Sequence, residues 1–166
     1  EKLSVFIEDL KKINILTHPP CINNSTFNFI IEKASNNSLS IRYSLSALKN
    51  IGHDAVQKIT DIRINKGNFK SIDDFLDKVP YNLLSKKLLE SLIMSGALDC
   101  LEGNRNKLFN SVDLMLNYSQ SIENERISNQ QNLFKQINNN HLSIKLPEIY
   151  NWGEEETLNN EFSSLG

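Results

Sequence analysis

Residues 45–59 read LSALKNIGHDAVQKI, where an Asn-Ile-Gly step interrupts an apolar pattern with helical spacing that resumes at once. Gly52 takes positive φ freely and Asn50 does so more readily than most residues, which predicts a tight corner between two short helices. The amides of Asn50, Ile51, Gly52 and His53 would point outward at the start of the second helix. Free N–H groups and the helix dipole attract an anion such as a phosphate there.

The residues next to this corner include some that favour anion binding and one that disfavours it. Lys49 and Lys58 would add positive charge, whereas Asp54 in the first helical turn competes for the same dipole. Leu48 and Ile51 are expected to anchor the corner from inside. An ordinary helix-turn-helix corner without a ligand therefore stays open as an alternative.

Other residues that could ligate a metal or take part in catalysis form no complete site. His18 and Cys21 have the spacing of half a metal site, but no second Cys or His pair completes it, so no metal site is predicted. No Asp-x-Asp pair offers carboxylates for two-metal catalysis. Asp73, Asp74 and Asp77 are typical of a solvated helix start. No catalytic residue is predicted.

The bulk composition bounds the class of protein. The 166 residues carry a net charge of −2, with 39% hydrophobic and 23% charged residues, which is ordinary globular composition for one or two domains. No apolar run is long enough for a membrane span, and the chain is expected to be an excised fragment. Cys21 and Cys100, its two cysteines, predict free thiols and a cytoplasmic location.

Charge is divided unevenly along the chain. Residues 41–87 hold nine Lys or Arg against five Asp, whereas residues 101–166 hold nine acidic against five basic residues. Only the first region has a charge balance that favours phosphates.

The elements that must position the corner are mainly α-helical. Alternation in TFNFIIE and LSIRYSL predicts a small β-hairpin. Ser71, Ser85 and Asn104 are expected to cap helices, and Gly67 and Gly96 to end them. Helices are predicted over residues 2–15, 46–48, 53–65, 72–79, 85–95, from 104 to about 127, and 154–162.

This pattern divides the chain into four parts. Residues 1–40 form an N-terminal region ending in the hairpin, and residues 41–127 form the helical domain. Residues 128–147 are a polar, flexible linker, and residues 148–166 contain a short acidic helix. Trp152 belongs either to the core or to an inter-domain contact.

The corner resembles the helix-hairpin-helix module, with Asn50 in place of its first glycine. Five blocks extend the resemblance: PPCIN, IRYSLSALKNIG, GNFKSIDDFLDKV, LSKKLLESLIMSGALD and GNRNKL. In this order the chain is similar over residues 2–166 to the C-family replicative polymerases, the bacterial DNA polymerase III alpha subunits, from the end of the fingers through the tandem helix-hairpin-helix region.

The resemblance implies a second, degenerate hairpin at residues 94–98, with Gly96 in it and with Lys86 and Lys87 on the preceding helix. It also implies that the domain grips duplex DNA through the backbone, without sequence preference. The fragment itself would catalyse nothing. Its parent would be a DNA-directed DNA polymerase that uses Mg²⁺ and assembles with other polymerase III holoenzyme subunits.

A second motif, QQNLF at residues 130–134, places two apolar residues inside the polar linker. It resembles the pentapeptide by which bacterial proteins bind the sliding clamp, and the polymerase family carries such a peptide after its helix-hairpin-helix region. Leu133 and Phe134 would fill an apolar pocket while Gln130 makes hydrogen bonds. A chance match and a hydrophobic anchor returning to the core are the alternatives.

Two other functional classes remain possible at this stage. DNA-repair glycosylases and nucleases also use the helix-hairpin-helix, but such glycosylases carry a Lys after the hairpin glycine, where this chain has His53 and Asp54. A purely structural connector between domains is the other.

Overall fold

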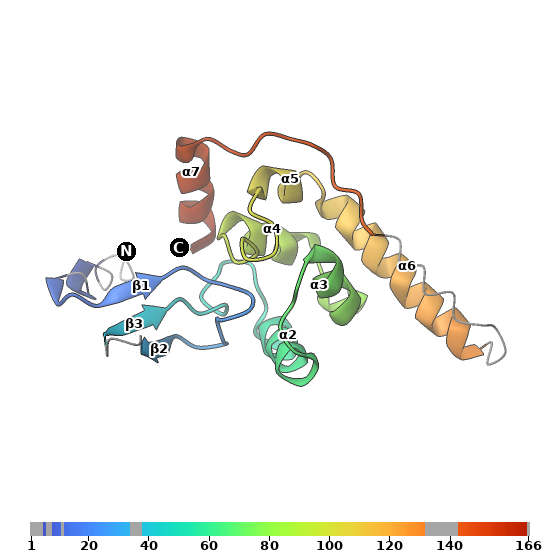
Figure 1. Cartoon of the computed structure of the whole chain (residues 1–166), viewed down its shortest axis with the longest axis horizontal. Coiled ribbons are helices and arrows are strands. Elements are labelled where there is room, and N and C mark those ends of the chain that lie inside the picture. The colour runs from blue at the N-terminus through green and yellow to red at the C-terminus, as the bar shows by residue number, and fades with distance from the viewer. Residues whose placement is uncertain (1–4, 6–7, 11, 34–37, 132–142, 166) are drawn as a thin grey trace.

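The structure is a computed structural model that describes residues 5, 8–10, 12–33, 38–131 and 143–165 (Figure 1). It is mainly helical with a small sheet, as the sequence predicted. The elements in chain order are β1 (Leu16–His18), β2 (Ile30–Lys33), β3 (Leu39–Arg42), α2 (His53–Lys66), α3 (Ile72–Lys78), the 3-10 helix η1 (Tyr81–Leu83), α4 (Lys86–Met94), α5 (Arg105–Phe109), α6 (Val112–Gln131) and α7 (Glu154–Leu165).

The sheet lies at one end of the molecule, and α6 extends away from the other end (Figure 1). The predicted hairpin is confirmed, because β2 and β3 pair antiparallel with Ile31 opposite Ile41. The strand β1, which the sequence analysis did not anticipate, pairs parallel with β3 and gives the order β1-β3-β2. A three-residue strand is too short for its alternation to be recognised.

The core is an apolar cluster among the helices. The contacts of α4 with α5, α6 and α7, and of α3 with α6, bring helical faces together. Full burial of each large side chain contributes roughly 1.5–3 kcal/mol of hydrophobic free energy. The largest buried side chains include Phe75, Ile59, Leu89, Leu92 and Met115.

The predicted helix boundaries are largely confirmed by their caps. The side chains of Ser71, Ser85 and Asn104 each accept a hydrogen bond from an amide in the first turn of α3, α4 and α5. Gly67 and Gly96 take positive φ values of 79° and 77° after α2 and α4. Left-handed backbone of this kind ends helices and favours glycine.

Two of the predicted helices differ from the structure. Residues 46–48 form turns, because the Ser44 hydroxyl accepts the Ala47 amide at 3.1 Å and three residues are too few to nucleate a helix. The helix after Asn104 breaks into α5 and α6 at residues 110–111, where the Ser111 hydroxyl donates to the Lys107 carbonyl at 2.7 Å.

The ends of the chain also differ from the expected boundaries. Within the predicted helix at residues 2–15, the described residues 5, 8–10 and 12 are helical, and residues 13–14 form a turn. α6 continues through residues 128–131, which the sequence analysis assigned to the linker; two of these four residues, Gln130 and Gln131, are good helix formers. Residues 132–142 of that linker lie outside the described residues.

A long extended segment, residues 143–153, returns from the α6 side to the sheet side of the molecule (Figure 1). Asp73 accepts the Ile144 amide at 2.8 Å, and Asn104 donates to the Ile149 carbonyl at 2.6 Å. Trp152 packs edge-on against Phe109 with ring centroids 5.5 Å apart. The segment therefore places α7, the predicted acidic helix, beside α4. Among the described residues, no helix has the length and apolarity needed to cross a membrane.

Candidate nucleic-acid interface

The first corner, residues 50–53, joins the turn at residues 45–50 to the start of α2. Asn50 has φ +60°, so it takes the left-handed conformation predicted for it. Gly52 is the N-cap of α2 with φ −72° and ψ 139°, an extended backbone that most residues adopt. The predicted positive φ at Gly52 was therefore wrong, because Asn50 alone reverses the chain.

The backbone donors of the first corner are unengaged. Within the described part of the chain, the amides from residue 50 to residue 54 donate no hydrogen bond, and Gly52 supplies no side-chain cap. The Gly52 carbonyl accepts the amides of Ala55 and Val56 at 3.1 and 3.2 Å, which begins the helix. Uncapped amides at the positive end of a helix dipole are groups that can hydrogen-bond to an anion.

The space in front of Gly52 is open. A Cβ built on this glycine would meet no atom within 4 Å, and Gly52, His53 and Asp54 are all exposed. The missing side chain is thus required neither by φ nor by packing. Its absence leaves the backbone at this position uncovered.

The corner is braced from behind by α4 and α7. The Lys49 amide donates to the Ser164 carbonyl of α7 at 2.9 Å, and the Lys49 carbonyl accepts the Ser91 hydroxyl of α4 at 2.7 Å. Leu48 and Ile51 are buried, as predicted, with 3% and 8% of their surface exposed. The unengaged amides are therefore presented on a fixed backbone.

The basic residues of region 41–87 separate into two groups. Four are engaged: Arg42 pairs with Glu32, Lys78 with Asp74, Lys86 with Asp113, and buried Arg63 donates to two carbonyls. The other five are exposed and form no ion pair within the described residues; they are Lys49, Lys58, Lys66, Lys70 and Lys87. Lys49 adjoins the corner, and Lys58 lies on α2, the helix that begins there. The negative charge of exposed Asp54, in the first turn of α2, counteracts the positive charge of these two lysines.

The His53 side chain is held beside the corner. Its ring lies edge-on to Phe27, with centroids 5.0 Å apart. Phe27 precedes β2, so this contact links the first turn of α2 to the sheet region. His53 thus places both its backbone amide and a ring of fixed orientation at the first corner.

The second corner, residues 94–98, is closed. Gly96 is buried, its amide donates to Ile93 at 3.0 Å, and the Ala97 amide donates to Leu92 at 2.9 Å. A Cβ on Gly96 would lie 2.3 Å from Nη2 of Arg105. A phosphate would meet the Arg105 side chain before it reached this glycine.

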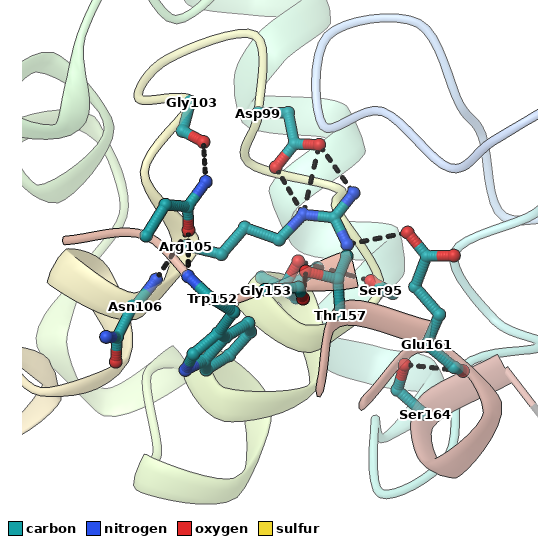
Figure 2. A network of polar contacts seen from close by, with 12 residues as sticks. Ser95, Asp99, Gly103, Arg105, Asn106, Trp152, Gly153, Thr157, Glu161 and Ser164 are labelled. Atoms are coloured by element: carbon teal, nitrogen blue, oxygen red, sulfur yellow. Dashed lines mark hydrogen bonds and ion pairs between the residues drawn. The ribbon is translucent and has the colours of Figure 1, made fainter. Parts of the chain in front are cut away.

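Arg105 covers the second corner as part of an ion-pair network. Its Nη2 lies 2.7 Å from Asp99, and its Nη1 lies 2.6 Å from Glu161 of α7. Figure 2 shows the guanidinium between these two carboxylates. Burial opposes the charge, but the two carboxylates hold the pKa of Arg105 above its ordinary value. The network joins α7 to the turn after α4.

Lys86 and Lys87 lie at the opposite end of α4 from Gly96. Ten residues at 1.5 Å each separate Lys86 from Gly96 by roughly 15 Å. A hydrogen bond to Asp113, at 3.0 Å, raises the pKa of Lys86. Exposed Lys87 remains available to a ligand, but it does not share a site with Gly96.

The residues of the second motif fall at and beyond the end of α6. Gln130 lies in the last turn of α6, whereas Leu133 and Phe134 lie outside the described residues. Elsewhere, His18 lies 4.0 Å from Glu32, and no group of three His, Cys, Asp or Glu side chains is gathered within the described ranges.

Sequence reasoning missed the residues that support the first corner. Ser91 and Ser164 are far from Lys49 in the sequence, and serines at those positions carry no periodic or capping signal. Arg105 was likewise not singled out, since its partners Asp99 and Glu161 come from two different elements.

Comparison with known proteins gives one family and consistent relatives. A family model described as "Helix-hairpin-helix motif" matches residues 14–108. DNA polymerase III subunit alpha of Neisseria meningitidis serogroup A is 31% identical over 166 residues, which cover 100% of this chain and 14% of the relative. The proteins of the same name from Bacillus subtilis and Rickettsia felis are 37% and 38% identical, and their matches cover 72% and 76% of this chain and 10% of each relative.

Proposed function

Because this chain belongs to the helix-hairpin-helix family, and resembles a segment of DNA polymerase III alpha subunits as its five sequence blocks predicted, we propose that it binds duplex DNA through the sugar-phosphate backbone. The first corner supplies the contact. Residues 50–54 direct their amides to one phosphate, and Lys49 and Lys58 add charge on either side.

One observation carries this proposal: the amides of residues 50–54 are unengaged and uncapped on a braced backbone, and these residues, except buried Ile51, are exposed. An amide donor cannot distinguish one phosphate from another, so such a contact positions DNA without reading its sequence. The second corner is closed by Arg105, so Gly96 is not part of the proposed contact. Lys86 and Lys87 would act at a separate point on the surface.

The binding mode predicts a moderate dependence on salt. If two or three phosphates are neutralised, the logarithm of the binding constant should fall with the logarithm of salt concentration at a slope of roughly −2 to −3. Two duplexes of unrelated sequence should give the same slope and affinity. A structural connector would bind neither duplex.

The variant Gly52→Ala tests the corner directly. The φ of −72° and the open space at Gly52 allow a Cβ without strain, so the fold should be unchanged. The same Cβ would keep a phosphate from the amides, and losing charge-assisted hydrogen bonds should weaken duplex binding by roughly tenfold or more. Fluorescence anisotropy with a labelled duplex measures this loss.

Gly103→Ala is the matched control, since a Cβ at Gly103 also meets nothing within 4 Å, and this glycine lies away from the corner. Its affinity should equal that of the unaltered chain. Equal affinity of Gly52→Ala and Gly103→Ala would refute the corner as the DNA contact. Scission of a damaged duplex by the chain would instead favour a repair enzyme.

We also propose that residues 130–134 bind a sliding clamp. Burial of Leu133 and Phe134 in an apolar pocket would contribute roughly 3–6 kcal/mol, part of which is spent on ordering the segment. The affinity of the peptide alone would then be modest. A clamp encircling DNA that the first corner also holds would have a high effective concentration.

Surface plasmon resonance on an immobilised bacterial sliding clamp tests this second contact. The double variant Leu133→Ala with Phe134→Ala should abolish binding, whereas Ile137→Ala, an apolar change outside the motif, should not. Equal loss in both variants would show that the motif is not the contact.

The relatives are named as subunits of DNA polymerase III, and the chain spans 14% or less of the three compared. We therefore propose that this DNA-binding region serves a longer cytoplasmic DNA polymerase within a holoenzyme. The Mg²⁺ ions for nucleotide transfer would be held by carboxylates outside these 166 residues, and this region would hold the duplex.

A further inference from the structure

The two cysteines, distant in sequence, are neighbours in the fold. Cys21, in the loop after β1, and Cys100, in the turns after α4, lie side by side: the Ile22 amide donates to the Ala97 carbonyl, and the Asn23 side chain reaches the Cys100 sulfur. Both are free, with Cys21 half-buried and Cys100 exposed. Solvent therefore reaches a pair of neighbouring thiols.

Bonds on both sides of the pair hold the two cysteines together. The Ile22 amide donates to the Ala97 carbonyl at 2.8 Å, which ties the loop after β1 to the turn after α4. The side chain of Asn23 exchanges two hydrogen bonds of 2.8 Å with the backbone of Phe69, and its Nδ2 also lies 3.7 Å from the Cys100 sulfur. The proximity of the two cysteines does not depend on an exposed loop alone.

The surroundings make the two thiols chemically unequal. The hydrogen bond from Cys100 lowers the pKa of Cys21 to about 6, against the effect of burial, and the amides of Asn23 and Asn24 act in the same direction. The adjacent Cys21 sulfur raises the pKa of Cys100. At neutral pH the pair therefore consists of the Cys21 thiolate, the reactive form of cysteine, and the Cys100 thiol, which can react in a second step.

We propose that Cys21 and Cys100 are a redox modification site that forms an intramolecular disulfide by exchange with a low-molecular-weight disulfide. The Cys21 thiolate attacks one sulfur of the small disulfide, forms a mixed disulfide and expels a small thiolate. Cys100 then loses its proton to solvent and attacks the Cys21 sulfur, which releases the second small thiolate. Two electrons pass from the cysteines to the small disulfide, which leaves as two thiols.

The second step follows from the first. Once Cys21 is part of a mixed disulfide, its sulfur no longer carries a negative charge. The electrostatic repulsion that raised the pKa of Cys100 is then removed, and Cys100 ionises more readily. The new bond would link the loop after β1 to the turn after α4 and enclose α2, α3 and α4 in a covalent ring. Restricting the unfolded chain in this way stabilises the fold, and this consequence does not depend on the proposed DNA contact.

Equilibration of the 166-residue chain with oxidised and reduced glutathione at several ratios tests the proposal. Intact mass after acid quenching should show a loss of two hydrogens with no glutathione adduct, and digestion should recover Cys21 and Cys100 in one cross-linked peptide. The oxidised form should have a Tm higher by roughly 10 °C. A lower Tm would contradict a fold that already places the two cysteines side by side.

Cys21→Ser and Cys100→Ser separate the two roles. Cys100→Ser should accumulate a stable glutathione adduct on Cys21, because the resolving thiol is missing, whereas Cys21→Ser should react at least tenfold more slowly. A stable adduct on the unaltered chain, disulfide-linked dimers, or two thiols still free in oxidised glutathione would each overturn the proposal.

Discussion

At the scale of single residues, the first corner divides two roles that the sequence analysis assigned together. Asn50 alone reverses the chain, with φ +60°, while Gly52 is extended and leaves open space before the helix start. Asn50 thus sets the backbone conformation of the corner, whereas Gly52 keeps the space in front of the backbone open. Substitutions at the two positions should consequently affect different measurements.

Asn50→Ala should lower the free energy of unfolding by about 1 kcal/mol, because a Cβ without a local hydrogen-bonding group is disfavoured at positive φ. Asn50→Gly should be close to neutral and should retain duplex binding. Urea denaturation measures the first effect. Equal stability of the two variants would mean that the left-handed conformation at residue 50 does not hold in solution.

At the scale of elements, α7 is the brace of the first corner. Its last turn accepts the Lys49 amide at Ser164, and the Tyr43 hydroxyl donates to Leu165 at 2.7 Å. Glu161, one turn earlier, pairs with Arg105 over the second corner. One helix therefore closes the second corner and steadies the first.

Glu161→Gln should weaken this brace. The Arg105 side chain is only 13% exposed, so losing one of its carboxylate partners should cost about 1 kcal/mol of stability. Hydrogen exchange at the Lys49 amide, which α7 holds, should quicken, and duplex affinity should fall modestly. Glu156→Gln, an exposed change on the same helix, is the control. If exchange quickened equally in both variants, the brace would not run through Glu161.

At the scale of the whole molecule, ion pairs link neighbouring segments and add to the stability that hydrophobic burial provides. Glu32 on β2 pairs with Arg42 on β3, and Glu102 pairs with Lys107 at 2.9 Å where α5 begins. The hydrogen bond from Arg42 holds the pKa of Glu32 below its usual value, and the one from Lys107 does the same for Glu102. Both carboxylates are therefore more acidic in the folded chain than in the unfolded chain.

Stability should consequently decline in acid. A carboxylate with a lowered folded pKa contributes stability that is complete above its unfolded pKa and is lost as pH falls through the folded value. The loss should thus begin as pH drops below about 4.5, the ordinary pKa of Glu. Urea midpoints measured across this range should fall less steeply in Glu32→Gln than in Glu148→Gln. Identical pH profiles for the two variants would contradict this ion-pair assignment.

Much of the fold was predictable because its determinants are local. Ser71, Ser85 and Asn104 cap helices through amides three residues away, and alternation in two short segments set the hairpin. The position of the first corner was also evident from Asn50 and Gly52, since the signal lies within a few residues. The order of five blocks along the chain was enough to recognise the resemblance to DNA polymerase III alpha subunits.

Only the tertiary structure decided what each corner presents. The sequence treated Gly52 and Gly96 alike, but Arg105 and two carboxylates from other elements cover Gly96, while the space before Gly52 is empty. The third strand, the return of α7 and the contact between Cys21 and Cys100 were likewise decided by long-range packing. Local sequence specifies backbone conformation, whereas exposure depends on which distant side chains fold over it.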